Sequence, residues 1–234
     1  MYTAYNAQQA SSRAEAVNAF MRGIYGWMAS GLALTAVVAV MTASSPAIMR
    51  VVFSPMVLIV LVLAQLGLVM GLSAAINRLS AGAATGMFLA YSGLNGLTLS
   101  SIFLVYTATS IASAFAVSAG MFLAMSLYGL ATKRDLTSLG SFMMMGLIGM
   151  IIAMVVNIFL HSSVMSFIID CVGVLVFTGL TAYDTQKLKD MGDYAPMNDA
   201  TALRRGSILG ALTLYLDFIN LFLIMLRFFG GSRD

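Results

Sequence analysis

Residues 139–160, LGSFMMMGLIGMIIAMVVNIFL, run without a single Asp, Glu, Lys or Arg side chain. A helix of about 20 predominantly apolar residues is long enough to cross the hydrocarbon core of a bilayer. Other runs of the same kind occur along the chain, and strands are excluded because these runs do not alternate and an open sheet edge cannot face lipid. The seven predicted spans are Ile24–Ala43, Val57–Ile76, Ala81–Val105, Ile111–Ala131, Leu139–Leu160, Val164–Tyr183 and Ile208–Phe229.

The composition agrees with these spans. Of the 234 residues, 60% are hydrophobic and 9% are charged, against roughly 25% charged residues in soluble domains. The prediction is an all-α integral membrane protein with one helical domain. A net charge of +3, without a basic patch, argues against nucleic acid as a partner. The single Cys171 excludes an internal disulfide framework, and with the single His161 it makes a metal cofactor unexpected.

The distribution of lysine and arginine predicts the orientation in the membrane. Three of the 12 basic residues fall on one side, and the other nine are Arg13, Arg22, Arg78, Lys133, Arg134, Lys187, Lys189, Arg204 and Arg205. The positive-inside rule then puts the N-terminus in the cytoplasm, and an odd number of spans puts the C-terminus outside. The alternative is that the last segment enters the membrane and returns, which would put the C-terminus in the cytoplasm. We expect a polar cytoplasmic tail over 1–22, a membrane domain over 23–230 and a short tail over 231–234. The one long connector, Thr185–Ser207, is expected to be a solvated loop.

Two aspartates occupy positions where a charge is costly. Asp184 ends the sixth predicted span and Asp217 lies well inside the seventh, and a lone charge in a bilayer costs at least about 2.5 kcal/mol. Counting spans places both towards the cytoplasmic side, so their side chains can meet. Adjacent carboxyl groups titrate as a unit, which makes a natural pH switch, and their oxygens suit Ca²⁺. The alternative is that each aspartate only bonds a neighbouring helix or a loop cation such as Lys187.

Other polar side chains within the spans are weaker candidates. Asp170 precedes Asp184 by 14 residues, close to four helical turns, so both are expected on one face of the helix. With Thr181 between them, that face can offer a carboxylate near each end of an ion path, unless Asp170 is simply an interface residue. Asn95 and Asn220 can line a hydrated path or bond neighbouring helices. Arg78 can reach an aspartate or anchor its helix at the cytoplasmic surface.

Several motifs carry a family resemblance. They are Tyr25-Gly26-Trp27-Met28, the run from Gly93 to Ile102, Thr132-Lys133-Arg134-Asp135-Leu136, Thr181-Ala182-Tyr183-Asp184, Leu214-Tyr215-Leu216-Asp217-Phe218-Ile219-Asn220-Leu221-Phe222 and Arg227-Phe228-Phe229-Gly230. On these residues the chain resembles the Bax inhibitor-1 family, also called the transmembrane Bax inhibitor motif family, and especially its bacterial inner-membrane members.

The resemblance implies a specific architecture and activity. Seven helices are expected, with the seventh central and enclosed by the other six. By position, Asp184 and Asp217 match a pair of aspartates that senses pH in that family, some of whose members pass Ca²⁺ as a leak. Arg78 is the nearest match to a basic residue tied to gating. Gln65 stands where some relatives carry an acidic residue within the second helix.

Three functions follow as hypotheses. The first is a pH-sensitive calcium leak channel in the inner membrane of a bacterium, with Ca²⁺ and protons as its partners and no catalytic role. The second is a regulatory protein that binds other membrane proteins, such as a quality-control protease, without conducting ions. The third is an intramembrane aspartyl protease, but such enzymes place a Gly-X-Gly before the second aspartate, where this chain has Leu214-Tyr215-Leu216.

Overall fold

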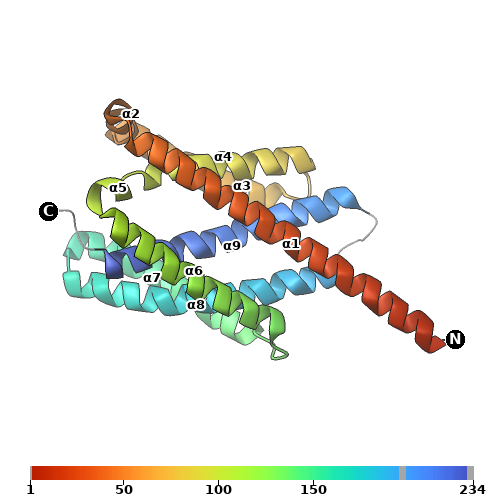
Figure 1. The fold of residues 1–234 in the computed structure, drawn as a ribbon. Helices are drawn as coiled ribbons and strands as arrows, with labels where there is room; N and C mark the ends of the chain where they lie inside the picture. Colours follow the sequence, from red (N-terminus) through yellow and green to blue (C-terminus); the bar gives the residue numbers. More distant parts are fainter. Residues whose placement is uncertain (1, 195–198, 231–234) are drawn as a thin grey trace. The chain divides into compact units, whose positions relative to one another are not determined.

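A computed structural model describes residues 2–194 and 199–230 of the chain, and the regular structure within these ranges is entirely helical (Figure 1). Within them, 7 helices are long and apolar enough to cross a membrane. The spans are α1 (Tyr2–Ala43), α3 (Pro55–Ala75), α4 (Ala81–Leu99) with α5 (Ile102–Val105), α6 (Ala108–Ala131), α7 (Thr137–Leu160), α8 (Ser163–Tyr194) and α9 (Ala200–Phe229). The all-α class and all seven predicted spans are confirmed, and the predicted tail 231–234 lies outside the described residues.

Three helices continue beyond the predicted apolar spans. The predicted solvated loop Thr185–Ser207 is wrong for most of its length, because α8 runs on to Tyr194 and α9 begins at Ala200. Likewise, α1 begins at Tyr2, so the polar segment ahead of the first predicted span is helical. The extensions are stabilised by packing on each other: a Cβ on Gly192 would lie 3.1 Å from the ring of Phe20.

Two short helices were not predicted, one between the first two spans and one within the third. The helix α2 (Pro46–Val52) forms in the segment between the first two spans, with Ser45 as its N-cap and a proline at its first position, an arrangement that favours helix initiation. The third span is interrupted at Ser100 and Ser101, where α4 ends and α5 begins. The Ser100 hydroxyl donates to the carbonyl oxygen of Leu97 at 2.6 Å, so the side chain supports the break.

The chain divides into two compact units. Unit 1 contains the described residues up to Val105 together with Leu188–Tyr215, and unit 2 contains Tyr106–Lys187 and the described residues from Leu216 onward. Both α8 and α9 therefore contribute to each unit. In unit 1, α1 packs closely on α4, since any side chain at Gly96 would collide with the backbone of Thr35. Such small-residue contacts let membrane helices approach each other closely.

The last helix is the most buried of the seven. Over an apolar stretch of 18 residues in each helix, 72% of α9 is buried, whereas only 6% of α7 is buried. A helix with little exposed surface presents few side chains to lipid, and its polar residues can contact other protein groups. The burial of α9 is consistent with the predicted enclosure of the seventh helix, and α9 carries Asp217.

Candidate functional site

Two carboxyl groups meet inside unit 2, one from α8 and one from α9. The carboxyl groups of Asp184 and Asp217 lie close enough together to interact electrostatically. Asp217 is 5% exposed and Asp184 is half-buried. An ionised carboxylate only accepts hydrogen bonds, so two carboxyl groups bond each other only when one of them carries a proton. The structure thus brings the two residues together, and their sharing of a proton stays a prediction. We call them the carboxylate pair.

One oxygen of the carboxylate pair lacks a partner. No described residue gives a hydrogen bond to Oδ2 of Asp217, which is fully buried, and an unsatisfied buried acceptor costs about 1–3 kcal/mol. The cation nearest along α8 is Lys187, which acts electrostatically on Asp184 and lies 5.7 Å from the centroid of the Tyr183 ring. Asp184 therefore interacts with both a lysine and a second carboxyl group.

The position of Asp184 is fixed by its neighbours in sequence. The ring of Tyr183 packs against α7 at Gly140, where any side chain would collide with it. The hydroxyl of Thr185 hydrogen-bonds the hydroxyl of Ser126 on α6 at 3.1 Å. Because the residues on either side of Asp184 are held by two different helices, its backbone has little freedom to move, which preorganises the carboxylate.

A third contact near Asp184 was not predicted from the sequence. The side-chain oxygen of Gln186 accepts from the backbone N–H of Leu136 at 2.8 Å, and its amide nitrogen donates to the carbonyl oxygen of Arg134 at 2.8 Å. These bonds attach the loop between α6 and α7 to α8. Within the loop, hydrogen bonds from the side chain and the backbone of Thr137 hold the pKa of the Asp135 carboxyl below its ordinary value of 3.8. The only sequence signal was the Thr132–Leu136 motif itself.

Asp217 is flanked by an aromatic cluster. The ring of Phe218 makes edge-to-face contacts with Phe115 and Phe122 of α6, with centroids 5.5 and 5.7 Å apart. Such pairs add about 0.5–1.5 kcal/mol beyond the area they bury. The aromatic side of α9 is therefore held by α6, while Asp217 faces α8.

Two predicted ion-path residues bond their own helices. The hydroxyl of Thr181 donates to the carbonyl oxygen of Phe177 at 2.8 Å. The amide of Asn220 donates to the carbonyl oxygen of Leu216 at 2.9 Å. Such bonds satisfy a polar group inside a membrane helix without a second helix or a water molecule. Their place along an ion path stays a prediction.

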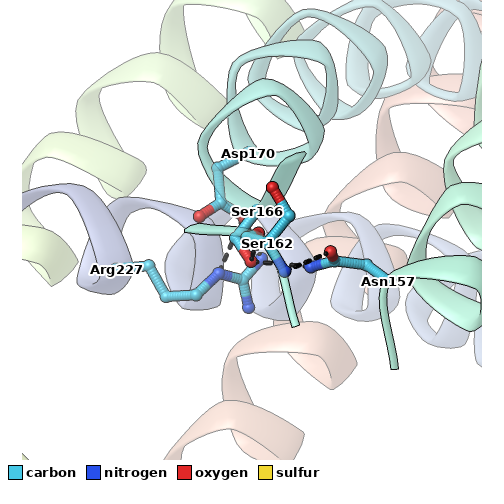
Figure 2. Close-up of polar contacts among 5 residues, drawn as sticks. All are labelled: Asn157, Ser162, Ser166, Asp170 and Arg227. Atoms are coloured by element: carbon cyan, nitrogen blue, oxygen red, sulfur yellow. Dashed lines mark hydrogen bonds and ion pairs between the residues drawn. The ribbon is translucent and has the colours of Figure 1, made fainter. Parts of the chain in front are cut away.

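Asp170 does not join the carboxylate pair. Its Oδ1 atom accepts from both Nη2 and Nε of Arg227, at 2.6 and 2.8 Å (Figure 2). Asp170 precedes Asp184 by 14 residues, which is ~21 Å along a helix. The ion pair links the first part of α8 to the last turn of α9, so each end of the α8–α9 contact in unit 2 carries a polar interaction.

Asn95 belongs to a different network, in unit 1. Its amide donates to the hydroxyl of Tyr215 at 2.9 Å, and that hydroxyl lies 2.6 Å from the hydroxyl of Thr35. Thr35 in turn donates to the carbonyl oxygen of Ser92. Tyr215 is fully buried and was missed as a functional residue, although it stands two positions before Asp217 in the same motif. The network bonds the first half of α9 to α1 and α4.

Arg78 lies in unit 1 with an exposed side chain, and its predicted gating role stays a prediction. The cation that the structure fixes at this turn is Arg205, whose Nη1 donates to the carbonyl oxygens of Asn77 and Leu79 at 2.8 and 3.2 Å. In the sequence, Arg205 is only one of the nine basic residues that predict the orientation. Its contact attaches the start of α9 to the turn between α3 and α4.

The carboxylate pair can supply part of a cation site. Across the described residues, no group of three or more His, Cys, Asp and Glu side chains is placed to hold a metal ion. Calcium takes six to eight oxygen ligands, of which Asp184 and Asp217 can supply at most four. Carbonyl groups and water would have to complete the shell, which suits a transient contact with a passing ion better than a storage site.

Comparisons with known proteins place the chain among membrane proteins. The model of the family described as "Inhibitor of apoptosis-promoting Bax1" matches residues 17–234. The Inner membrane protein YbhL of Escherichia coli strain K12 is 57% identical over 215 residues, covering 92% of each chain. An uncharacterized protein of Borreliella burgdorferi is 46% identical over 218 residues, covering 93% of this chain and 94% of its own. An uncharacterized membrane protein of Streptococcus pyogenes serotype M1 is 39% identical over 219 residues.

Proposed function

Because the chain belongs to the Bax inhibitor-1 family of integral membrane proteins, we propose that it is a pH-sensitive calcium leak channel gated by the carboxylate pair. The observation that supports this most directly is the contact between Asp184 and Asp217. Buried polar groups within membrane spans are costly, so they are usually kept for transport or proton handling.

The gate works through the number of protons that the carboxylate pair holds. With one proton, Asp184 and Asp217 hydrogen-bond and hold α8 against α9. With no proton, two like charges repel, and with two protons both charges are lost. Each change alters the force between the two helices, and the unpartnered Oδ2 of Asp217 leaves an acceptor for a proton or a passing Ca²⁺.

The chain is also proposed to lie in a particular membrane and in a particular orientation. The Escherichia coli relative is named an inner membrane protein, and we place this chain in the inner membrane of a bacterium. Nine of the 12 basic residues, Lys133, Arg134 and Lys187 among them, fall on one side of the membrane. By the positive-inside rule, we place the N-terminus and the Asp184 end of α8 on that side, in the cytoplasm. The C-terminus is then outside.

Calcium flux into proteoliposomes tests this function. The wild type is expected to pass Ca²⁺ down its gradient at a rate that depends on pH. Asp184→Asn and Asp217→Asn are each expected to flatten that pH profile, because an amide does not titrate. Asp190→Asn is the matched control, since Asp190 is an exposed carboxylate on the same helix. A wild type without flux, or single variants with the wild-type pH profile, would contradict the proposal.

A second function is favoured by the same contact. Two carboxyl groups that share a proton are also the catalytic arrangement of aspartyl proteases. The leak is preferred because those enzymes carry Gly-X-Gly before the second aspartate, and this chain has Leu214-Tyr215-Leu216 there. Incubation with a panel of transmembrane peptides distinguishes the two functions. Cleavage that is lost in Asp217→Asn would support the protease, and intact peptides beside a measurable flux would support the leak.

A further inference from the structure

Three contacts join the far end of α8 to the end of α9 in unit 2. The ring centroids of Phe167 and Phe228 are 5.7 Å apart. Asp170 forms its ion pair with Arg227. The three α8 positions are Phe167, Asp170 and Gly173, spaced by three residues, and a Cβ on Gly173 would lie 2.6 Å from Cδ1 of Ile224. Residues three apart lie along one face of a helix, so these contacts form a continuous antiparallel seam.

The ion pair is the one directional contact of this seam. The apolar contacts constrain the register by shape, and the free energy of burying their surface is itself not directional. By contrast, two guanidinium nitrogens of Arg227 converge on a single carboxylate oxygen of Asp170, and Asp170 is 8% exposed. A slide would leave a largely buried carboxylate without its cation. The Arg227 side chain is 42% exposed, so the carboxylate is the buried partner of the pair. A polar pair between two helices is best known for fixing their register.

The beginning of α8 is itself held firmly (Figure 2). The amide of Asn157, near the end of α7, donates to the hydroxyl of Ser166 at 2.8 Å, and its oxygen accepts from the backbone N–H of Ser162 at 3.0 Å. The Ser162 hydroxyl accepts from the backbone N–H of Met165 as a helix cap. Asp170 is one turn further along α8, so the carboxylate that receives Arg227 stands on a fixed support.

The register of α9 against α8 at Asp170 and Arg227 determines whether Asp184 and Asp217 can meet at the other end of the contact. The carboxylate pair lies 14 residues from Asp170 along α8 and 10 residues from Arg227 along α9, or ~21 and ~15 Å. A slip of α9 by one helical turn, ~5.4 Å, would move Asp217 out of reach of Asp184. The ring of Phe218 beside Asp217 makes its edge-to-face contacts with α6.

We propose that Asp170 and Arg227 are a positioning pair: their ion pair sets the register of α9 against α8 that brings Asp184 and Asp217 together. This proposal rests on the proposed function in one respect only: the loss of the register is expected to disturb a pH-dependent gate. The register itself can be measured without any flux.

Disulfide cross-linking reads the register directly. The full chain carries Asp184→Cys and Asp217→Cys in a Cys171→Ala background, so that the two new thiols are alone. Oxidation with copper phenanthroline in lipid vesicles is expected to join them in most molecules. Adding Arg227→Gln or Asp170→Asn is expected to lower the cross-linking rate at least fivefold, and exchanging the charges with Asp170→Arg and Arg227→Asp is expected to restore much of it. Arg50→Gln, outside unit 2, is the control and should leave the rate unchanged.

Two outcomes would overturn the positioning role. The first is a wild-type cross-linking rate in Arg227→Gln and Asp170→Asn. The second is a low rate that the charge exchange fails to raise in protein that elutes as a single species on size exclusion. Arg227→Lys, which keeps the charge but loses the planar fork, should give an intermediate rate.

Flux measurements separate this inference from the leak itself. With Asp184 and Asp217 intact, Arg227→Gln is expected to reduce the pH-dependent part of the calcium flux at least threefold. An unchanged pH profile in Arg227→Gln would refute the positioning role while leaving the leak in place. A wild type without flux would refute the leak, and the cross-linking rates would still decide the register.

Discussion

At the scale of single residues, Gln186 holds the loop between α6 and α7 against α8, two positions after Asp184. Gln186→Ala removes two hydrogen bonds to the loop backbone, each with a net value of about 1 kcal/mol. A change of one or two kcal/mol alters a local equilibrium about 5–30-fold. We therefore expect trypsin to cleave after Lys133 and Arg134 several-fold faster in the variant than in the wild type, in vesicles that expose this loop.

The matched control for this loop is Gln186→Glu. The carboxylate keeps an acceptor for the N–H of Leu136 and loses the donor to the carbonyl oxygen of Arg134. Its cleavage rate should lie between those of the wild type and Gln186→Ala. Equal rates for all three proteins would show that the two bonds do not hold the loop.

Asp135 gives the same loop a pH dependence. Its Oδ1 accepts from the backbone N–H of Thr137 at 2.8 Å at the start of α7, and the hydrogen bonds hold its pKa below 3.8. A depressed pKa stabilises the folded loop above the ordinary value, and this stabilisation is lost as pH falls through the lower folded value. We expect the Thr137 amide to be protected, relative to its intrinsic exchange rate at each pH, at pH 5 and above, and less protected in Asp135→Ala. Equal exchange in both proteins at pH 6 would contradict the cap.

The two site aspartates were predictable from sequence because a buried charge is costly. Asp184 and Asp217 stood out within apolar runs, and counting spans was enough to place them at one level. The partner of Asp170 was not predictable in the same way. Arg227 is separated from Asp170 by 57 residues and sits in the last turn of a helix, where an arginine usually serves as an interface anchor. Only the register of α8 and α9 shows that the two meet.

At the scale of elements, the first half of α9 is fixed by the hydroxyl of Tyr215. Tyr215→Phe keeps the ring and its edge-to-face contacts with Phe88 and Tyr91, and it removes the bonds to Thr35 and Asn95. A buried donor or acceptor left without a partner costs about 1–3 kcal/mol. Tyr215→Phe should lower the midpoint of thermal unfolding in detergent measurably.

Tyr91→Phe is the comparison for this prediction, because it removes a hydroxyl from the ring beside Tyr215 and leaves the Thr35 and Asn95 bonds intact. We expect a smaller loss of stability than in Tyr215→Phe. A Tyr215→Phe protein that unfolds at the wild-type temperature would show that the network does not hold α9.

The elements themselves were predictable to different degrees. The seven spans follow from the length of apolar helix that a bilayer requires, so their cores could be placed from composition. The polar continuations of α1 and α8 could not, because outside a membrane the same polar residues suit a helix or a loop. Tertiary packing decides between them, as in the contact of Gly192 with Phe20.

At the scale of the whole molecule, α8 and α9 are the elements that run through both compact units. Their residues in unit 1 include the network of Tyr215, and their residues in unit 2 include the carboxylate pair and the ion pair of Asp170 with Arg227. The family was predictable from motifs spread over most of the chain, and the match to residues 17–234 confirms it.

The proposed gate requires Asp184 and Asp217 to act as one titrating unit. A double-mutant cycle on the pH profile of calcium flux tests it most directly, with the wild type, Asp184→Asn, Asp217→Asn and the double variant in identical proteoliposomes. Residues that act as a unit are strongly non-additive. We expect each single variant to lose as much of the pH dependence as the double variant does. Losses that simply add, or a pH profile that survives in the double variant, would contradict the account.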